Sequence, residues 1–139
     1  LYGSEVWISA YGEENRQGYS FAGLQLNEMR KLGLSIRGIK TRLNEEGTAD
    51  YYGILRFCEA EDIPAALIEH CHIDNDADVG FCDSNEDLIA LGKADATAAA
   101  KFFRLSSKSL GVDYSDNTEA SPHPAQVTPK WTPRTRISA

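Results

Sequence analysis

The stretch IPAALIEHCHIDND, residues 63–76, begins as an apolar run and leads directly into a glutamate, two histidines and a cysteine. The run shows no alternation of apolar and polar residues, which is typical of a strand covered on both faces in a parallel sheet. Glu69 ends this predicted strand. Ligands of open α/β sheets bind at the carboxyl ends of strands, so Glu69 stands where a catalytic carboxylate is expected.

Upstream of this strand, the sequence predicts a short strand and a helix. Residues 6–8 read as the strand, and residues 10–20 read as a turn-like segment. Ser20 is a possible N-cap for the helix and Gly33 its expected end. The helix is indicated by apolar residues at helical spacing, namely Ala22, Leu26, Met29 and Leu32.

Further strand and helix signals follow. Residues 34–42 predict a weaker strand or extended loop, and residues 50–60 a second helix with Tyr51, Ile54, Leu55 and Cys58 on one face. The last helix opens at Ser84, with Asp87 three residues on as a capping-box variant. We expect its apolar stripe to cover the sheet; the stripe comprises Leu88, Leu91, Ala98, Phe102 and Leu105. This order predicts an α/β fold, with a mixed or mainly parallel twisted sheet and helices on both faces.

The length and the proline distribution predict one domain followed by a tail. A chain of 139 residues is long enough for one compact domain and too short for two comfortable ones. Residues 1–110 carry the strand and helix signals. Residues 111–139 hold four of the five prolines and almost no aliphatic residues, which predicts a Pro-rich linker or tail.

Charge and cysteine content exclude some classes of function. A net charge of −7 with scattered acidic residues argues against nucleic acid as the main partner, and no apolar run approaches the length of a membrane span. The three cysteines, Cys58, Cys71 and Cys82, form no CxxC pair and leave the redox compartment open. A disulfide between Cys71 and Cys82 and free thiols remain alternatives.

Glu69 has two readings from its position alone. Burial at the end of an apolar strand raises a carboxyl pKa, which suits a general base working near neutral pH. A structural carboxylate that accepts hydrogen bonds from backbone amides or from an arginine fits the same position.

A resemblance favours the catalytic reading. The chain carries Arg37-Gly38-x-Lys40, then Leu55-Arg56, then Pro64-Ala65-x-Leu67-Ile68-Glu69 and Asn75, and then a long Ala-rich helix. In this register the sequence resembles the C-terminal part of zinc-dependent N-acetylmuramoyl-L-alanine amidases of the amidase-3 type, over roughly residues 3 to 103. GSEVW, residues 3–7, is similar to the strand that follows the last zinc-binding histidine of that family.

The resemblance implies a peptidoglycan hydrolase. Such an enzyme cuts the amide bond between N-acetylmuramic acid and the L-alanine of the stem peptide, and is secreted or on the cell surface. Glu69 matches the glutamate that exchanges protons beside the zinc. The family's zinc ligands would all precede Leu1, so the resemblance implies that the N-terminal portion of the domain is missing from this chain and that residues 1–139 alone are inactive. That missing portion is then a possible partner, together with peptidoglycan and its muropeptides.

The loop after Glu69 departs from the family pattern and leaves alternatives open. His70 and His72 can point the same way in an extended segment, which allows a substitute metal site, although they lack further ligands at a familiar spacing. Otherwise His70 is expected to line the substrate cleft and His72 to pack. Arg37 is a candidate contact for stem-peptide carboxylates or a member of a structural ion pair. The rival functions are a non-catalytic amidase-like module that binds muropeptide or a partner protein, and a different metallopeptidase.

Overall fold

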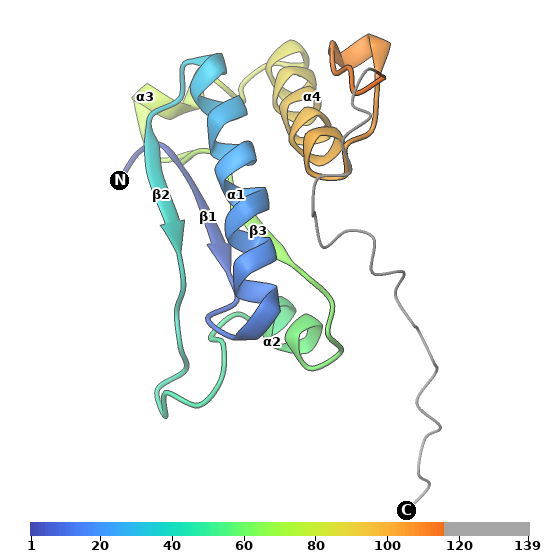
Figure 1. Cartoon of the computed structure of the whole chain (residues 1–139). Helices are drawn as coiled ribbons and strands as arrows, with labels where there is room; N and C mark the ends of the chain where they lie inside the picture. Colours follow the sequence, from blue (N-terminus) through green and yellow to red (C-terminus); the bar gives the residue numbers. More distant parts are fainter. Residues whose placement is uncertain (116–139) are drawn as a thin grey trace, which may run out of the picture.

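A computed structural model describes residues 1–115 as an α/β structure (Figure 1). The predicted α/β class with a mixed sheet is confirmed. The elements in chain order are β1 (Ser4–Ile8), α1 (Gly12–Leu32), β2 (Ile36–Lys40), α2 (Gly53–Glu59), β3 (Ala66–Glu69), α3 (Asp76–Val79), α4 (Asn85–Phe102) and a 3-10 turn, η1 (Lys108–Leu110).

The sheet is mixed and has the strand order β2-β1-β3. Strand β1 pairs in parallel with β2 and antiparallel with β3. The parallel, doubly covered setting predicted for residues 63–69 is therefore wrong, because β3 is antiparallel and its four residues are only partly buried. An apolar run without alternation cannot by itself separate a central strand from an edge strand, and within the described residues β3 has only one neighbour.

Helix α1 covers one face of the sheet. Val6 and Ile8 of β1 pack against Ala22 and Leu26 of α1 in a fully buried cluster. Partly buried apolar side chains from the two outer strands surround this cluster, namely Ile36, Ile39, Ala66 and Ile68. Gly18 brings the helix close to the strand, since a Cβ at this position would lie 3.0 Å from the Cβ of Ile8.

The start of α1 differs from the sequence prediction. The helix begins at Gly12 rather than near Ser20, so the segment interpreted as a turn is its first two turns. Tyr11 occupies the N-cap without a side-chain hydrogen bond, which explains why no capping residue marks the start. Glu13 and Glu14 supply favourable charge in the first turn. The predicted end is confirmed, with Gly33 in the left-handed region at φ 101°.

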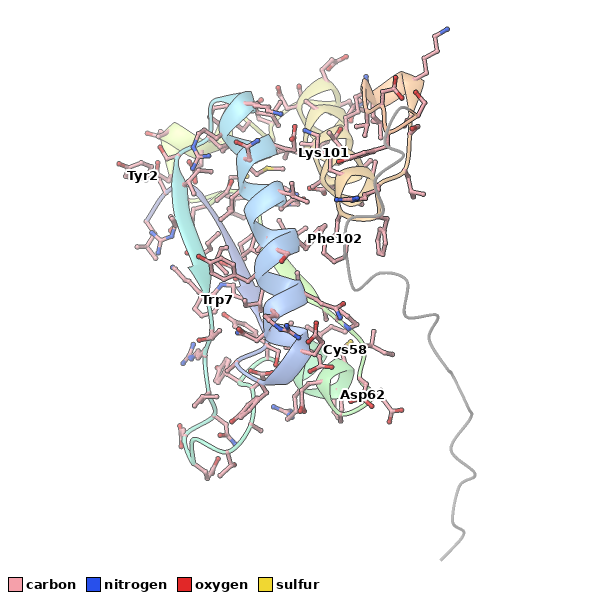
Figure 2. The ribbon with its side chains drawn as sticks, in the orientation of Figure 1. Tyr2, Trp7, Cys58, Asp62, Lys101 and Phe102 are labelled. Atoms are coloured by element: carbon pink, nitrogen blue, oxygen red, sulfur yellow. The ribbon has the colours of Figure 1, made fainter. Side chains whose placement is uncertain are left out.

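Helix α4 packs on α1 and forms a second helical layer, rather than covering the sheet as predicted. Met29 of α1 and Leu34 contact Leu91 and Ala94. Figure 2 shows Lys101 and Phe102 on the side of α4 that faces α1, where Lys101 pairs with Glu28 at 2.6 Å and Phe102 meets Phe21 edge-on. The N-cap prediction is confirmed by the Asp87 amide, which donates to the Ser84 hydroxyl at 3.1 Å. Leu88 and Leu105 of the predicted stripe are exposed instead.

The second helix is shorter than predicted. It spans Gly53–Glu59, and of the four residues predicted to share one face only Leu55 is buried. Asp50 lies before the helix, fully buried, where its carboxylate accepts the Ala10 amide at 2.9 Å. Asp50 therefore fixes the turn from β1 into α1.

The folded part of the chain continues past residue 110. Val112 is buried, and it is paired with Ser107 in an isolated antiparallel bridge. The Tyr114 amide donates to the Ser106 hydroxyl at 2.8 Å. The first residues of the predicted tail, 111–115, therefore have described structure, and the linker prediction for residues 116–139 lies outside the described residues.

Candidate functional site

Two glutamates face each other across the sheet. In the antiparallel pairing of β1 and β3, Glu5 lies directly opposite Glu69. Side chains alternate along a strand, so both carboxyls point away from α1, whereas Val6 and Ile68 point toward it. The Glu69 side chain lies close enough to that of Glu5 to lower the Glu5 pKa. Glu5 is 4 % exposed, so this pair is built into the protein rather than displayed on its surface.

Two cations hold the Glu5 carboxylate. Arg37 Nε lies 2.5 Å from Glu5 Oε2, and Lys40 Nζ contacts the same oxygen. The indole nitrogen of Trp7 donates to the other oxygen, Glu5 Oε1, at 3.0 Å. Both carboxylate oxygens of Glu5 therefore accept hydrogen bonds from groups other than Glu69.

A β-bulge brings the two cations to the same face. Residues three apart in a regular strand point to opposite faces, so Arg37 and Lys40 would diverge. The register between β1 and β2 shifts here, since Ser4 pairs with Ile36 but Glu5 pairs with Gly38. Gly38 adopts φ 108°, a conformation that side-chain-bearing residues rarely adopt. The extra residue returns Arg37 and Lys40 to the face of Glu5.

Replacing the bulge glycine tests this role. Gly38→Ala is expected to lower the free energy of unfolding by about 1–3 kcal/mol, because alanine is strained at this φ although nothing lies within 4 Å to clash with it. Gly23→Ala is the matched control, because Gly23 lies inside α1 with open space around it; that change should stabilise the chain by about 0.5–1 kcal/mol. Urea unfolding of both variants measures the difference. If Gly38→Ala leaves the free energy of unfolding unchanged, the claim that alanine is strained at this position is wrong.

The electrostatics of the site fix the charge of Glu5. Burial alone would raise the pKa of Glu5, but the hydrogen bonds from Lys40 and Arg37, and then the one from Glu69, lower that pKa from 4.5 to about 2. Glu5 therefore remains an anion at any ordinary pH.

Aromatic rings line the side of this site. The ring of Trp7 lies 5.2 Å from that of Tyr52, which in turn meets Tyr51 edge-on at 5.2 Å. Burial, and then the negative charge of Glu69, raise the pKa of Tyr52, so its hydroxyl keeps its proton near the glutamate pair. The guanidinium of Arg42 stacks on the Tyr51 ring at 3.7 Å. Aromatic walls with a few polar groups are typical of ligand sites.

The structure does not bring His70 to Glu69. The next residue in a strand points to the other face, and His70 Nε2 lies there 2.9 Å from the Asp95 carboxylate of α4. The amide of Gln25, on α1, donates to the same carboxylate at 2.6 Å. His70 thus links the end of β3 to both long helices and does not line a cleft beside Glu69.

The rest of the loop after β3 is held by backbone hydrogen bonds. The His72 amide donates to Asp78 Oδ2 at 2.9 Å, and the Gly3 amide donates to the same oxygen at 2.6 Å. Asn75 caps α3 by accepting from the Ala77 amide at 2.9 Å. Asp78, which the sequence analysis did not single out, is fully buried and joins this loop to the start of β1.

The described residues do not form a metal cage. Among residues 1–115, no three His, Cys, Asp or Glu side chains are arranged to hold a metal ion. The alternative site at His70 and His72 therefore has no third ligand in this part of the chain. Glu69 and Glu5 do not provide one either, since Glu5 is occupied by two cations. The residues present do not fit zinc on their own.

The sequence pointed to Glu69 and Arg37, and the structure brings both to one face of the sheet, with Arg37 as the ion-pair member. Sequence reasoning missed Glu5. The signal that could have found it is a lone acidic residue in a short strand, directly before the apolar residues 6–8. A buried strand accommodates such a charge only when partners are supplied, and Arg37 and Lys40 supply them.

Comparisons with known proteins give one informative likeness. No protein-family model and no curated protein sequence matches the chain. The chain is similar in structure to Cwp6 from Clostridium difficile. The match has a TM-score of 0.65 and 24 % sequence identity, and it covers 73 % of this chain but 16 % of that one. At this identity the likeness shows a shared fold, and this chain spans only a small part of the length of Cwp6.

Proposed function

We propose that this chain is the C-terminal portion of the catalytic domain of a peptidoglycan amidase, which cleaves the bond between N-acetylmuramic acid and the L-alanine of the stem peptide. The observation that carries the proposal is the Glu5–Glu69 pair. Two cations keep the Glu5 carboxyl anionic, and Glu69 lies directly opposite it across the sheet. Paired carboxyls held in different environments are typical of acid–base catalysis.

In the proposed reaction Glu69 is the proton carrier. Its ionised form accepts a proton from the attacking water while the oxygen bonds to the amide carbonyl carbon. The same carboxyl then gives that proton to the nitrogen of L-alanine as the C–N bond breaks, so Glu69 returns to its starting state. The products are a free lactyl carboxylate on the sugar and a peptide with a free amino terminus.

Glu5 and its partners position Glu69 in this scheme. Arg37 and Lys40 neutralise Glu5, so a second negative charge on Glu69 is tolerated during turnover. The protonated hydroxyl of Tyr52 and the ring of Trp7 form the adjoining wall. This wall offers apolar surface and a hydrogen-bond donor to a sugar or peptide bound at the site.

The comparison supports a role at the cell wall but does not specify an activity. Cwp6 is a cell wall protein of C. difficile, and the shared fold is consistent with a related setting for this chain. A secreted or cell-surface location is part of the proposal. Within residues 1–115 no helix combines the length and the apolar character needed to cross a membrane.

Zinc belongs to the proposal only through the sequence resemblance. Because residues 1–115 do not provide a cage, the ligands would have to come from outside the described part of the chain. The roles given to Glu69 and Glu5 rest on their own contacts and do not depend on where a metal is held.

The test compares residues 1–139 with the chain extended by whatever its gene encodes before Leu1, here called the extended chain. Both are incubated with purified muropeptides, and the products are identified by mass spectrometry. We expect the extended chain to release stem peptides with a free L-alanine amino group, and residues 1–139 alone to release none. Release of cut glycan strands, or cleavage within the stem peptide, would identify a different hydrolase. Muropeptide binding without cleavage by the extended chain would favour the non-catalytic module instead.

A further inference from the structure

Two of the three cysteines lie together between the sheet and the two long helices. Cys71 follows His70 in the loop after β3, and Cys82 lies in the turn between α3 and α4. Both are partly buried free thiols that pack on one apolar cluster formed by Met29, Leu34, Leu91 and Ala94. The two thiols lie close enough for Cys82 to raise the pKa of Cys71.

One residue fixes the backbone on both sides of this pair. The Asp78 carboxylate accepts the amide of His72, next to Cys71, at 2.9 Å. The Asp78 carbonyl accepts the amide of Phe81, next to Cys82, at 2.9 Å. The two cysteine-bearing segments are thus tied to the same point independently of their sulfur atoms, so their proximity is built into the fold.

The third cysteine lies elsewhere. Cys58 belongs to α2, and Figure 1 shows α2 and α3 at opposite ends of the sheet. Figure 2 places Cys58 at that far end. The structure therefore selects one pair, although Cys71 is separated by thirteen residues from Cys58 and by eleven from Cys82 along the chain.

We propose that Cys71 and Cys82 form a disulfide when the folded chain meets a small-molecule disulfide oxidant, and that this bond closes the segment following Glu69 onto the start of α4. The inference does not depend on the proposed amidase activity. It assigns a covalent modification to a pair that sequence alone left open between a disulfide and two thiols.

The chemistry is thiol–disulfide exchange with an oxidant R–S–S–R. One cysteine, as its thiolate, attacks the oxidant and releases the first R–S⁻, which takes up a proton. The second cysteine loses its proton and attacks the mixed disulfide, which forms the protein S–S bond and releases the second R–SH. Two cysteine hydrogens and two electrons pass to the oxidant. Burial, together with the neighbouring Cys82 thiol, raises the pKa of Cys71 to about 11, so the exchange should be slow at neutral pH and faster in alkali.

The experiment uses the full 139-residue chain, oxidised glutathione and two successive alkylating reagents that mark free and then reduced cysteines. Peptide mass spectrometry should find Cys71 and Cys82 joined, with the mass of two hydrogens lost, while Cys58 remains free or carries glutathione. The thermal midpoint should rise by roughly 5–15 °C on oxidation and fall again on reduction, because the bond closes a loop of about 12 residues.

Denatured protein provides the matched control. In guanidinium the separations from Cys71 to Cys58 and to Cys82 are similar, so both pairings should form, whereas the native chain should form only one. Cys58→Ser should oxidise like the wild type, and Cys71→Ser should leave Cys82 as a mixed disulfide with glutathione. The proposal is overturned if native oxidation joins Cys58 to either partner, or if Cys71 and Cys82 stay as open to alkylation as Cys58. The wild-type measurement decides the matter even if a variant does not fold.

Discussion

Glu69→Gln is expected to lower the rate of muropeptide hydrolysis by the extended chain about 10²–10⁴-fold, with little change in its thermal midpoint. The glutamine amide keeps the size of the side chain and can still hydrogen bond to Glu5 across the sheet. It cannot take a proton from water or pass one to the leaving nitrogen. The loss should therefore fall on turnover rather than on folding or on substrate binding.

Glu46→Gln is the control for this substitution. It is the same change of glutamate to glutamine, at an exposed position in the loop between β2 and α2. Release of stem peptides is followed by mass spectrometry under saturating and limiting substrate. If Glu69→Gln hydrolyses muropeptides at a near wild-type rate, the assignment of Glu69 as proton carrier is wrong. If both variants lose activity equally, the effect does not belong to the site.

The stability of residues 1–139 is expected to fall by about 3 kcal/mol through the titration of Glu5 alone, as pH drops from about 4.5 to about 2. The folded-state pKa of Glu5 is lower than its unfolded value, so the unfolded chain binds a proton first on acidification. The contribution is therefore fully present above pH 4.5 and is lost as pH falls toward the folded pKa. The side chain is only 5 % exposed, so solvent screens its ion pairs weakly.

Urea unfolding across this pH range measures the effect. Glu28 also has a lowered pKa, because its hydrogen bonds from Lys101 and Lys31 outweigh burial, so it adds to the acid loss. The difference between wild type and Glu5→Gln isolates Glu5: the variant should be less stable at pH 7 and should approach the wild type in acid. Glu46→Gln should follow the wild type throughout. A constant gap between wild type and Glu5→Gln at every pH would show that Glu5 stabilises through packing rather than charge.

The fold was predictable where one local signal was sufficient. The apolar run at residues 66–69, the N-cap at Ser84 and the stop at Gly33 each mark an element by chemistry within a few residues. The start of α1 had no such mark, because Tyr11 caps it without a side-chain bond. The packing of α4 on α1 was also hidden, since an apolar stripe does not say whether a helix or a sheet will cover it.

The site was predictable in part for the same reason. Glu69 is marked by its place at the end of a strand, but its partner Glu5 comes from a strand more than sixty residues earlier. The joint action of Arg37 and Lys40 depends on a bulge, and regular strand periodicity places them on opposite faces. Long-range pairing and an irregular register are both set by tertiary structure, which no short window of sequence contains.

The position of β1 in the middle of the sheet has a consequence for how the chain is made. As the ribosome extends the chain, β1, α1 and β2 emerge before β3 and can associate, but the edge of β1 that pairs with β3 stays open until β3 follows. At roughly 5–20 residues per second, the interval between the emergence of Ile8 and Glu69 is several seconds. During that interval the carboxylate of Glu5 can already pair with Arg37 and Lys40, which places a neutralised charge on an open strand edge. While the edge of β1 is still unpaired, the nascent chain can therefore already contain the ion pairs of Glu5, although β3 has not yet been translated.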